Sequence, residues 1–209
     1  MNKKYEITNI IHPKYPWLHR IRALENIRKD VHSGDLGGFV QSEENLSQEG
    51  RCWIFDDAIV GEQVFLSGDA VLRGTACARG CAAVSGDADI GQNAVVEDYA
   101  IISSGEITGN AHISGNANIH KNCVTGFAPS VSGSATVYGE LSGRVVVLQY
   151  TVILPGMKID NPTPDMIQCH PDKVILMRSK NRETNSISPP DGWQKQHQTA
   201  KKRHRGEER

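Results

Sequence analysis

Residues 54–102 decide the fold and divide into hexads: IFDDAI, VGEQVF, LSGDAV, LRGTAC, ARGCAA, VSGDAD, IGQNAV and VEDYAI, followed by Ile102. The first residue of every hexad is aliphatic, and the fifth is alanine in all but one, where it is Val64. A period of six fits neither an amphipathic α-helix nor a simple alternating strand. The pattern predicts short strands, each contributing one large and one small inward-facing side chain.

The hexads continue towards the C-terminus after a one-residue shift at Glu106. The large register then reads Ile107, Ile113, Ile119, Thr125, Val131 and Val137, and the small register reads Ala111, Ala117, Cys123, Pro129, Ala135 and Leu141. Glycine and asparagine recur between them, where a sharp corner needs a left-handed backbone. Three strands make a triangular coil of eighteen residues. We therefore predict an all-β fold, a single-stranded left-handed parallel β-helix of about five coils. The shift at Glu106 is expected to be a corner adjustment with little functional content.

The regions flanking the hexads predict a cap at each end. Residues 1–50 are expected to form an N-terminal β cap, 51–142 the β-helix, 143–178 an irregular C-terminal extension of strands, and 179–209 a disordered basic tail. Within the cap, the segment Gly34–Val40 is rich in glycine. It lacks the spacing and the lysine of a phosphate-binding loop, so we expect a tight turn that leads into a strand.

Composition restricts the class of protein. The chain has 209 residues and a net charge of −1, which gives the whole molecule no nucleic-acid or membrane signature. The charge is uneven, because residues 171–209 carry 10 basic and 5 acidic residues, leaving 13 basic and 19 acidic for the rest. Five cysteines without an apolar leader favour reduced thiols in the cytoplasm. Cys77 and Cys81 have no second ligand pair nearby, so no metal site is predicted.

A family resemblance rests on the entry to the first coil. The motifs Gly34-Asp35-Leu36-Gly37-Gly38-Phe39-Val40, Ser42-Glu43-Glu44-Asn45-Leu46 and Cys52-Trp53-Ile54-Phe55-Asp56-Asp57-Ala58 resemble those of YdcK-like hexapeptide-repeat proteins of enterobacteria and phages. The resemblance covers about residues 1–142. It implies a left-handed β-helix in the cytoplasm, or in the host cytoplasm if the protein is phage-encoded. Members are often labelled acyltransferases on fold grounds, and the resemblance supplies no catalytic residues.

Two histidines of the predicted β-helix are candidate catalytic bases. Hexapeptide-repeat acyltransferases use an outward-facing histidine, with acyl-CoA as the donor. His112 precedes inward Ile113 and His120 follows inward Ile119, so both should point outward, where a solvated or interface role is the simpler interpretation. The hexads run almost without insertion, so the donor-binding loops of such enzymes are expected to be missing. Two histidines also lack the third ligand that zinc hydration chemistry needs.

The basic tail leaves three alternatives open. Lys201, Lys202, Arg203 and Arg205 could contact nucleic acid through counterion release, act as a solubilising extension, or lie on the acidic body of a neighbouring subunit. We predict a homotrimer, since flat prism faces pack well by threefold symmetry. Two functions follow. The preferred one is a non-enzymatic binding protein, phage- or prophage-associated and without a cofactor, that holds a host protein or a small anionic ligand. The alternative is the acyltransferase.

Overall fold

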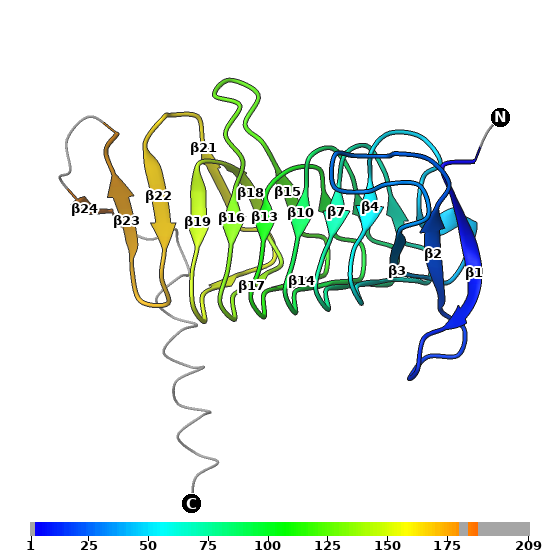
Figure 1. The fold of residues 1–209 in the computed structure, drawn as a ribbon. Helices are drawn as coiled ribbons and strands as arrows, with labels where there is room; N and C mark the ends of the chain where they lie inside the picture. The colour runs from blue at the N-terminus through cyan, green and yellow to red at the C-terminus, as the bar shows by residue number, and fades with distance from the viewer. Residues whose placement is uncertain (1–2, 180–183, 188–209) are drawn as a thin grey trace, which may run out of the picture.

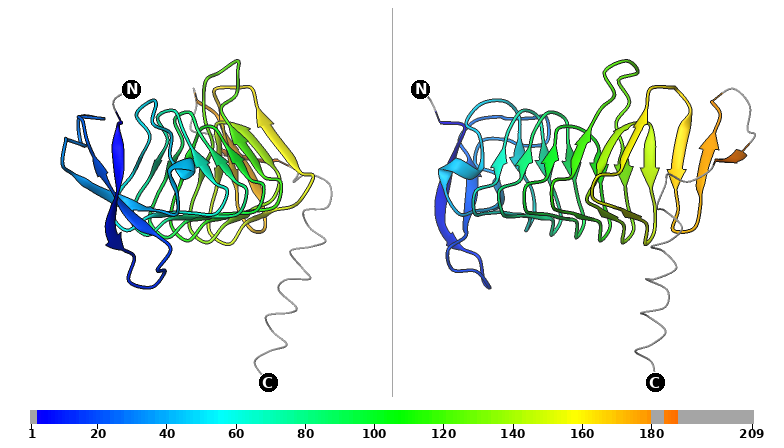
Figure 2. Two further views of the ribbon diagram at one scale, coloured as in Figure 1. Left: turned by 90° about the vertical axis from the view of Figure 1, so that its right-hand side faces the viewer. Right: turned by 180° about the vertical axis from the view of Figure 1, so that it is seen from behind.

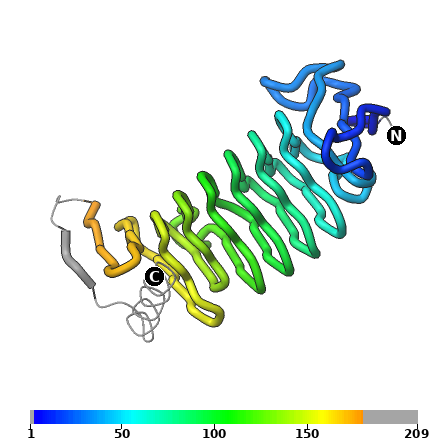
Figure 3. The backbone as a smooth tube through the Cα atoms, turned by 90° about the horizontal axis from the view of Figure 1, so that it is seen from below, coloured from blue at the N-terminus to red at the C-terminus, as the bar shows by residue number. Residues whose placement is uncertain are grey.

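The structure is a computed structural model that describes residues 3–179 and 184–187. Its regular structure is β apart from one short 3-10 helix, η1 (Glu43–Asn45). Successive coils of the chain stack along one axis and form a solenoid between an N-terminal cap and a C-terminal group of strands (Figures 1 and 3). The predicted all-β parallel β-helix is confirmed.

Three walls, each a stacked sheet, form the prism (Figure 2). Wall I contains β4 (Trp53–Ile54), β7 (Val71–Leu72), β10 (Asp89–Ile90), β13 (Glu106–Ile107), β16 (Ser130–Val131), β19 (Val145–Val147) and β22 (Met166–Cys169). Wall II contains β5 (Ile59–Val60), β8 (Cys77–Ala78), β11 (Val95–Val96), β14 (His112–Ile113), β17 (Thr136–Val137) and β20 (Val152–Ile153). Wall III contains β6 (Phe65–Leu66), β9 (Ala83–Val84), β12 (Ile101–Ile102), β15 (Asn118–His120), β18 (Glu140–Gly143) and β21 (Lys158–Asn161).

The hexad explains both the core and the stacking. Every large-register residue from Ile54 to Ile102 is fully buried, and the alanines between them fill the corners of the prism. Residues eighteen positions apart pair in parallel, as Ile54 does with Leu72 and Leu72 with Ile90. The shift at Glu106 is the predicted corner adjustment, because Ile90 pairs with Ile107 in unbroken register.

The corners use a left-handed backbone at equivalent positions of successive coils. Asp56, Gly74 and Gln92 share one corner and have φ values of 53°, 68° and 58°. Acidic residues at this corner and at a neighbouring one also cap the next coil. The Asp56 carboxylate accepts the Gly74 N–H at 2.8 Å, and that of Asp98 accepts the Gly115 N–H at 2.9 Å. Asp tolerates this backbone region because its short side chain finds a local hydrogen bond.

The solenoid has about seven turns rather than the expected five. Wall I has nine strands, of which the last two are antiparallel additions, which leaves seven in the parallel stack. After a four-residue step from Val137 to Leu141, the six-residue step returns at Val147 and Ile153, both buried. Leu141 therefore belongs to the large register, where it pairs with Ile119, and its assignment to the small register was wrong.

One corner carries an insertion that was not predicted from the sequence. The large register passes from Ile119 in wall III directly to Val131 in wall I, and residues 121–128 leave the coil as a loop (Figure 1). Pro129 keeps its predicted place in the small register, where it is buried and its oxygen accepts the Glu106 N–H at 3.1 Å. Thr125 and Cys123 are not inward-facing, and Cys123 is exposed. The side-chain oxygen of Asn122 closes the loop by accepting the N–H groups of Val124 and Thr125 at 2.9 and 3.1 Å. The expectation of hexads almost without insertion is wrong at this corner.

The N-terminal cap extends wall II. Strands β1 (Tyr5–Ile11), β2 (His19–Ala23) and β3 (Leu36–Val40) form an antiparallel meander, and β3 then pairs in parallel with β5. Gly34 provides the turn before β3 with a φ of 95°. A Cβ atom on Gly38 would lie 2.3 Å from Cγ2 of Ile54, so glycine allows β3 to pass close over the first coil. The predicted tight turn that leads into a strand is confirmed, and the close packing at Gly38 is an additional role of this glycine-rich segment.

Antiparallel strands also end the solenoid at its other end. Strand β23 (Val174–Met177) reverses along β22, and β24 (Thr184–Ile187) pairs with β23. The sequence predicted disorder from residue 179 onward, whereas residues 184–187 form a strand. The edge of β23 presents free backbone N–H and C=O groups, and pairing with β24 satisfies them.

Candidate functional site

His112 stands in a stack of three side chains that crosses successive coils of wall II. Its Nε2 lies 2.6 Å from Oε1 of Glu97, and Oε2 of Glu97 lies 2.5 Å from Nη2 of Arg79. Each coil places its outward residues over those of the previous coil, so residues far apart in sequence meet. We call Arg79, Glu97 and His112 the His112 stack.

The electrostatics of the His112 stack keep Glu97 ionised. Burial raises the pKa of the Glu97 carboxyl, but hydrogen bonds from His112 and Arg79 outweigh burial, and the net pKa is lowered. The same carboxylate raises the pKa of Arg79 through its hydrogen bond. A carboxylate on one ring nitrogen fixes the orientation of an imidazole. Within the described residues Nδ1 of His112 has no hydrogen-bond partner, so this nitrogen is available to a proton donor.

His120 lies on wall III, away from His112, and is more fully engaged. Its Nδ1 lies 3.0 Å from the carbonyl oxygen of Lys121, and its Nε2 lies 3.2 Å from Oε1 of Glu140. Glu140 also accepts from Nζ of Lys158 at 2.9 Å, and this hydrogen bond is the main reason why the pKa of Glu140 is lowered. Both ring nitrogens of His120 already face acceptors. Of the two predicted candidates, His112 alone has a ring nitrogen that no acceptor of the described residues faces.

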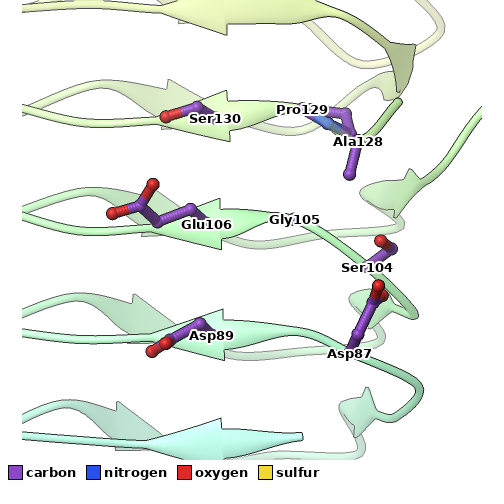
Figure 4. Close-up of a pocket in the computed structure, with 8 residues that line it drawn as sticks. All are labelled: Asp87, Asp89, Ser104, Gly105, Glu106, Ala128, Pro129 and Ser130. Atoms are coloured by element: carbon purple, nitrogen blue, oxygen red, sulfur yellow. The ribbon is translucent and has the colours of Figure 1, made fainter. Parts of the chain in front are cut away.

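A hollow of about 340 Å³ opens where wall III turns into wall I. It spans three coils and is lined by Asp87, Asp89, Ser104, Gly105, Glu106, Ala128, Pro129 and Ser130 (Figure 4). We call it the corner hollow. Three of its lining residues are acidic, and the insertion loop 121–128 borders it through Ala128.

The corner hollow results from the one-residue shift. Two coils share the corner sequence Ser-Gly-Asp-Ala, at residues 67–70 and 85–88. In the next coil Gly105 takes the position of the alanine. The Gly105 carbonyl oxygen accepts the Asp89 N–H at 2.9 Å, just as the Ala88 carbonyl oxygen accepts the Val71 N–H one coil earlier. Only Ser103 and Ser104 remain before Gly105, so the corner recedes between its neighbours. The shift therefore shapes a cavity, although it was expected to have little functional content.

Exposed apolar side chains gather at two further places. Phe65 and Ile101 on wall III are 47% and 51% exposed and flank Ala83, with which both pair across the strands. Tyr99 lies at the adjoining corner and is 65% exposed. We call these four residues the wall III stripe.

The second place is the loop between β1 and β2, which extends beyond the body of the solenoid (Figure 1). There His12 stacks on Tyr15 with ring centroids 5.1 Å apart, and Tyr15 contacts Trp17 at 5.6 Å. Trp17 is 58% exposed. We call these three residues the cap knob.

The remaining predicted sites can be placed briefly. Lys201, Lys202, Arg203 and Arg205 lie outside the described residues. Cys77 is half-buried and Cys81 exposed, and neither joins a cluster of His, Cys, Asp or Glu suited to a metal ion within residues 3–179. No helix in the described part of the chain is long and apolar enough to cross a membrane. No protein-family model matches the chain, and no curated protein matches it.

Proposed function

We propose that this chain is a non-enzymatic binding protein that assembles as a trimer of β-helices. The observation that carries the proposal is the wall III stripe. Contiguous exposed apolar side chains on a soluble protein mark a surface that another molecule covers. The stripe runs along the direction in which the coils stack, so three copies can align their stripes about a common threefold axis.

The cap knob supplies the surface for a partner of another kind. Trp and Tyr dominate the energetics of protein interfaces, and a stacked aromatic group loses little conformational freedom on binding. We infer a protein partner at the knob. The corner hollow is acidic, so it is an unfavourable place for the small anionic ligand that was one of the expected partners.

The entry motif of the first coil supports a wider assignment. Its similarity to YdcK-like hexapeptide-repeat proteins favours a phage or prophage origin and a place in the cytoplasm. All five cysteines are free in the structure, which fits a reducing compartment. We include this origin in the proposal.

Native mass spectrometry of the full chain tests the assembly. The wild type should be trimeric. In the double variant Phe65→Ser, Ile101→Ser, dissociation into monomers should already occur at a protein concentration at least about tenfold higher than in the wild type, because each copy loses apolar contact area. Tyr150→Ser is the matched control, since Tyr150 is 76% exposed and lies outside the stripe. A monomeric wild type, or a control that dissociates equally, contradicts the proposal.

A second candidate function is the acyltransferase, and the His112 stack favours it. A histidine held by an ionised glutamate, with its second nitrogen free, can remove a proton from an acceptor hydroxyl or amine while acyl-CoA supplies the acyl group. The insertion loop also weakens the argument that donor-binding loops are missing.

This alternative predicts acetyl transfer from acetyl-CoA to one of a panel of amine and hydroxyl acceptors. Replacing a general base usually costs about 10²–10⁴ in rate, so His112→Ala should abolish measurable transfer. His120→Ala should leave the rate within about twofold, and Glu97→Gln should lower it by less than His112→Ala does. No transfer by the wild type, or equal loss in both histidine variants, contradicts this function.

A further inference from the structure

We propose that the corner hollow binds an aliphatic diammonium ligand of the polyamine class. Its polar groups lie in two places, with apolar surface between them (Figure 4). Asp87 and Ser104 occupy one end, and the Asp89 and Glu106 side chains point away towards the other. Gly105, Ala128 and Pro129 supply surface for a methylene chain. The volume of about 340 Å³ falls within the usual range of small-molecule sites.

The buried hydroxyl of Ser104 is the first observation that points to a ligand. Ser104 is 1% exposed, and its Oγ has no hydrogen-bond partner. Buried polar atoms are nearly always paired, because an unpaired one loses its bonds to water without replacement. In Figure 4 the Asp87 carboxylate is directed towards Ser104, and no hydrogen bond joins the two side chains. An ammonium group between them would donate to both.

The second end of the corner hollow concentrates negative charge. Asp89 and Glu106 are direct neighbours on the parallel strands β10 and β13, where like charges destabilise a sheet. Arg73 partly compensates Asp89, since its Nε lies 3.1 Å from Oδ1. Within residues 3–179 the carboxylate of Glu106 has neither a hydrogen bond nor an ion pair. A second ammonium group at Glu106 would complete the compensation.

The separation of the two acidic ends favours a diamine over other cations. A metal ion needs several oxygen ligands converging on one point, and the described residues contain no group of three side chains with that arrangement. An ammonium group carries three donors and no acceptor, which suits a hydroxyl and carboxylates without a competing donor. This inference depends on neither the trimer nor the acyltransferase.

Calorimetric titration of the full chain with putrescine tests the inference, with butylamine as the single-ammonium probe. We expect putrescine to bind once per chain and at least about tenfold more tightly than butylamine. Ser104→Ala should weaken putrescine about tenfold, since it removes one charge-assisted hydrogen bond. Glu106→Gln should reduce putrescine to about the affinity of butylamine.

Matched variants separate the site from general effects. Ser103→Ala makes the same change at a neighbour that does not line the hollow, and Glu44→Gln removes one charge from an exposed cap residue. Both should bind putrescine within about twofold of the wild type. In the absence of ligand, Ser104→Ala should melt at a higher temperature than the wild type, because it removes a buried hydroxyl without a hydrogen-bond partner. Such a result excludes misfolding as the cause of weaker binding.

Three results would overturn the inference. The first is equal affinity of putrescine for the Ser104→Ala and Ser103→Ala variants. The second is putrescine binding no tighter than butylamine. The third is displacement of putrescine by equimolar Ca²⁺ or Mg²⁺, which would assign the hollow to a metal ion. Since Glu106 is on the surface, its variant tests the ligand even if Ser104→Ala fails to fold.

Discussion

Gly86→Ala should unfold the protein about 10 °C earlier than the wild type or prevent folding altogether. Gly86 has a φ of 60°, and a Cβ atom there would lie 2.1 Å from the carbonyl oxygen of Ser103 in the next coil. The left-handed backbone alone costs an alanine about 1–2 kcal/mol. The contact adds more, because the obstructing atom is backbone and cannot rotate away, so we expect a total of about 4 kcal/mol.

Gly126→Ala is the matched control for this prediction. Gly126 has a φ of 71°, but no atom outside its chain neighbours lies within 4 Å of the added Cβ. The control therefore carries the backbone cost without the contact and should lose only about 1 kcal/mol. Thermal unfolding of both variants by circular dichroism measures the difference. Equal losses would show that the coils do not stack as closely at Gly86 as the structure has them.

Ile102→Ala should destabilise the fold by about 3 kcal/mol, whereas the adjacent Ile101→Ala should change it by less than about 0.5 kcal/mol. The two residues form one strand, β12, and point to opposite sides of wall III. Ile102 is fully buried, and Ile101 is 51% exposed. Truncating Ile102 leaves a cavity in a stacked core that cannot collapse, while truncating Ile101 removes atoms that already contact solvent in a single chain.

Urea unfolding over a range of protein concentrations measures both variants. If Ile101 lies at a subunit interface, the apparent stability of its variant should fall more at low protein concentration than that of the wild type. Ile102→Ala should lose stability by the same amount at every concentration. A larger loss for Ile101 than for Ile102 at all concentrations would contradict the assignment of inward and outward positions.

The regular part of the solenoid could be predicted because the signal repeats many times. Each hexad repeats the same requirement, an aliphatic residue followed four positions later by a small one, so a single exception such as Val64 does not obscure it. The β character of the N-terminal cap was also predicted. Local composition was sufficient wherever a segment obeyed one period.

The insertion loop and the later coils could not be predicted, because chance residues filled the register. Cys123 and Thr125 satisfied the spacing although residues 121–128 leave the coil. After Val137, the four-residue step hid the return of the six-residue period at Val147. In both cases the hydrogen bonds between coils, and not the spacing along the chain, determine which residue faces inward.

The partners at the candidate sites were harder to predict than the site residues themselves. The outward direction of His112 followed from inward Ile113. Its contact with Glu97 depends on how successive coils align across the shift at Glu106. The corner hollow was missed for the same reason, since a short corner becomes a cavity only between two longer ones. The serine pair at 103–104 in place of Gly-Asp was the one available signal.

Antiparallel strands close both ends of the solenoid, and this limits how the molecule can grow. A parallel stack with bare ends offers the same hydrogen-bonding template to every new copy, and such templates elongate into fibrils. Here β1 and β2 extend wall II at one end and β23 and β24 extend wall I at the other, so neither of these two edges repeats the parallel pairing of a coil. End-to-end addition of copies is disfavoured along these two edges, and the number of coils encoded in the chain thus sets the molecular length.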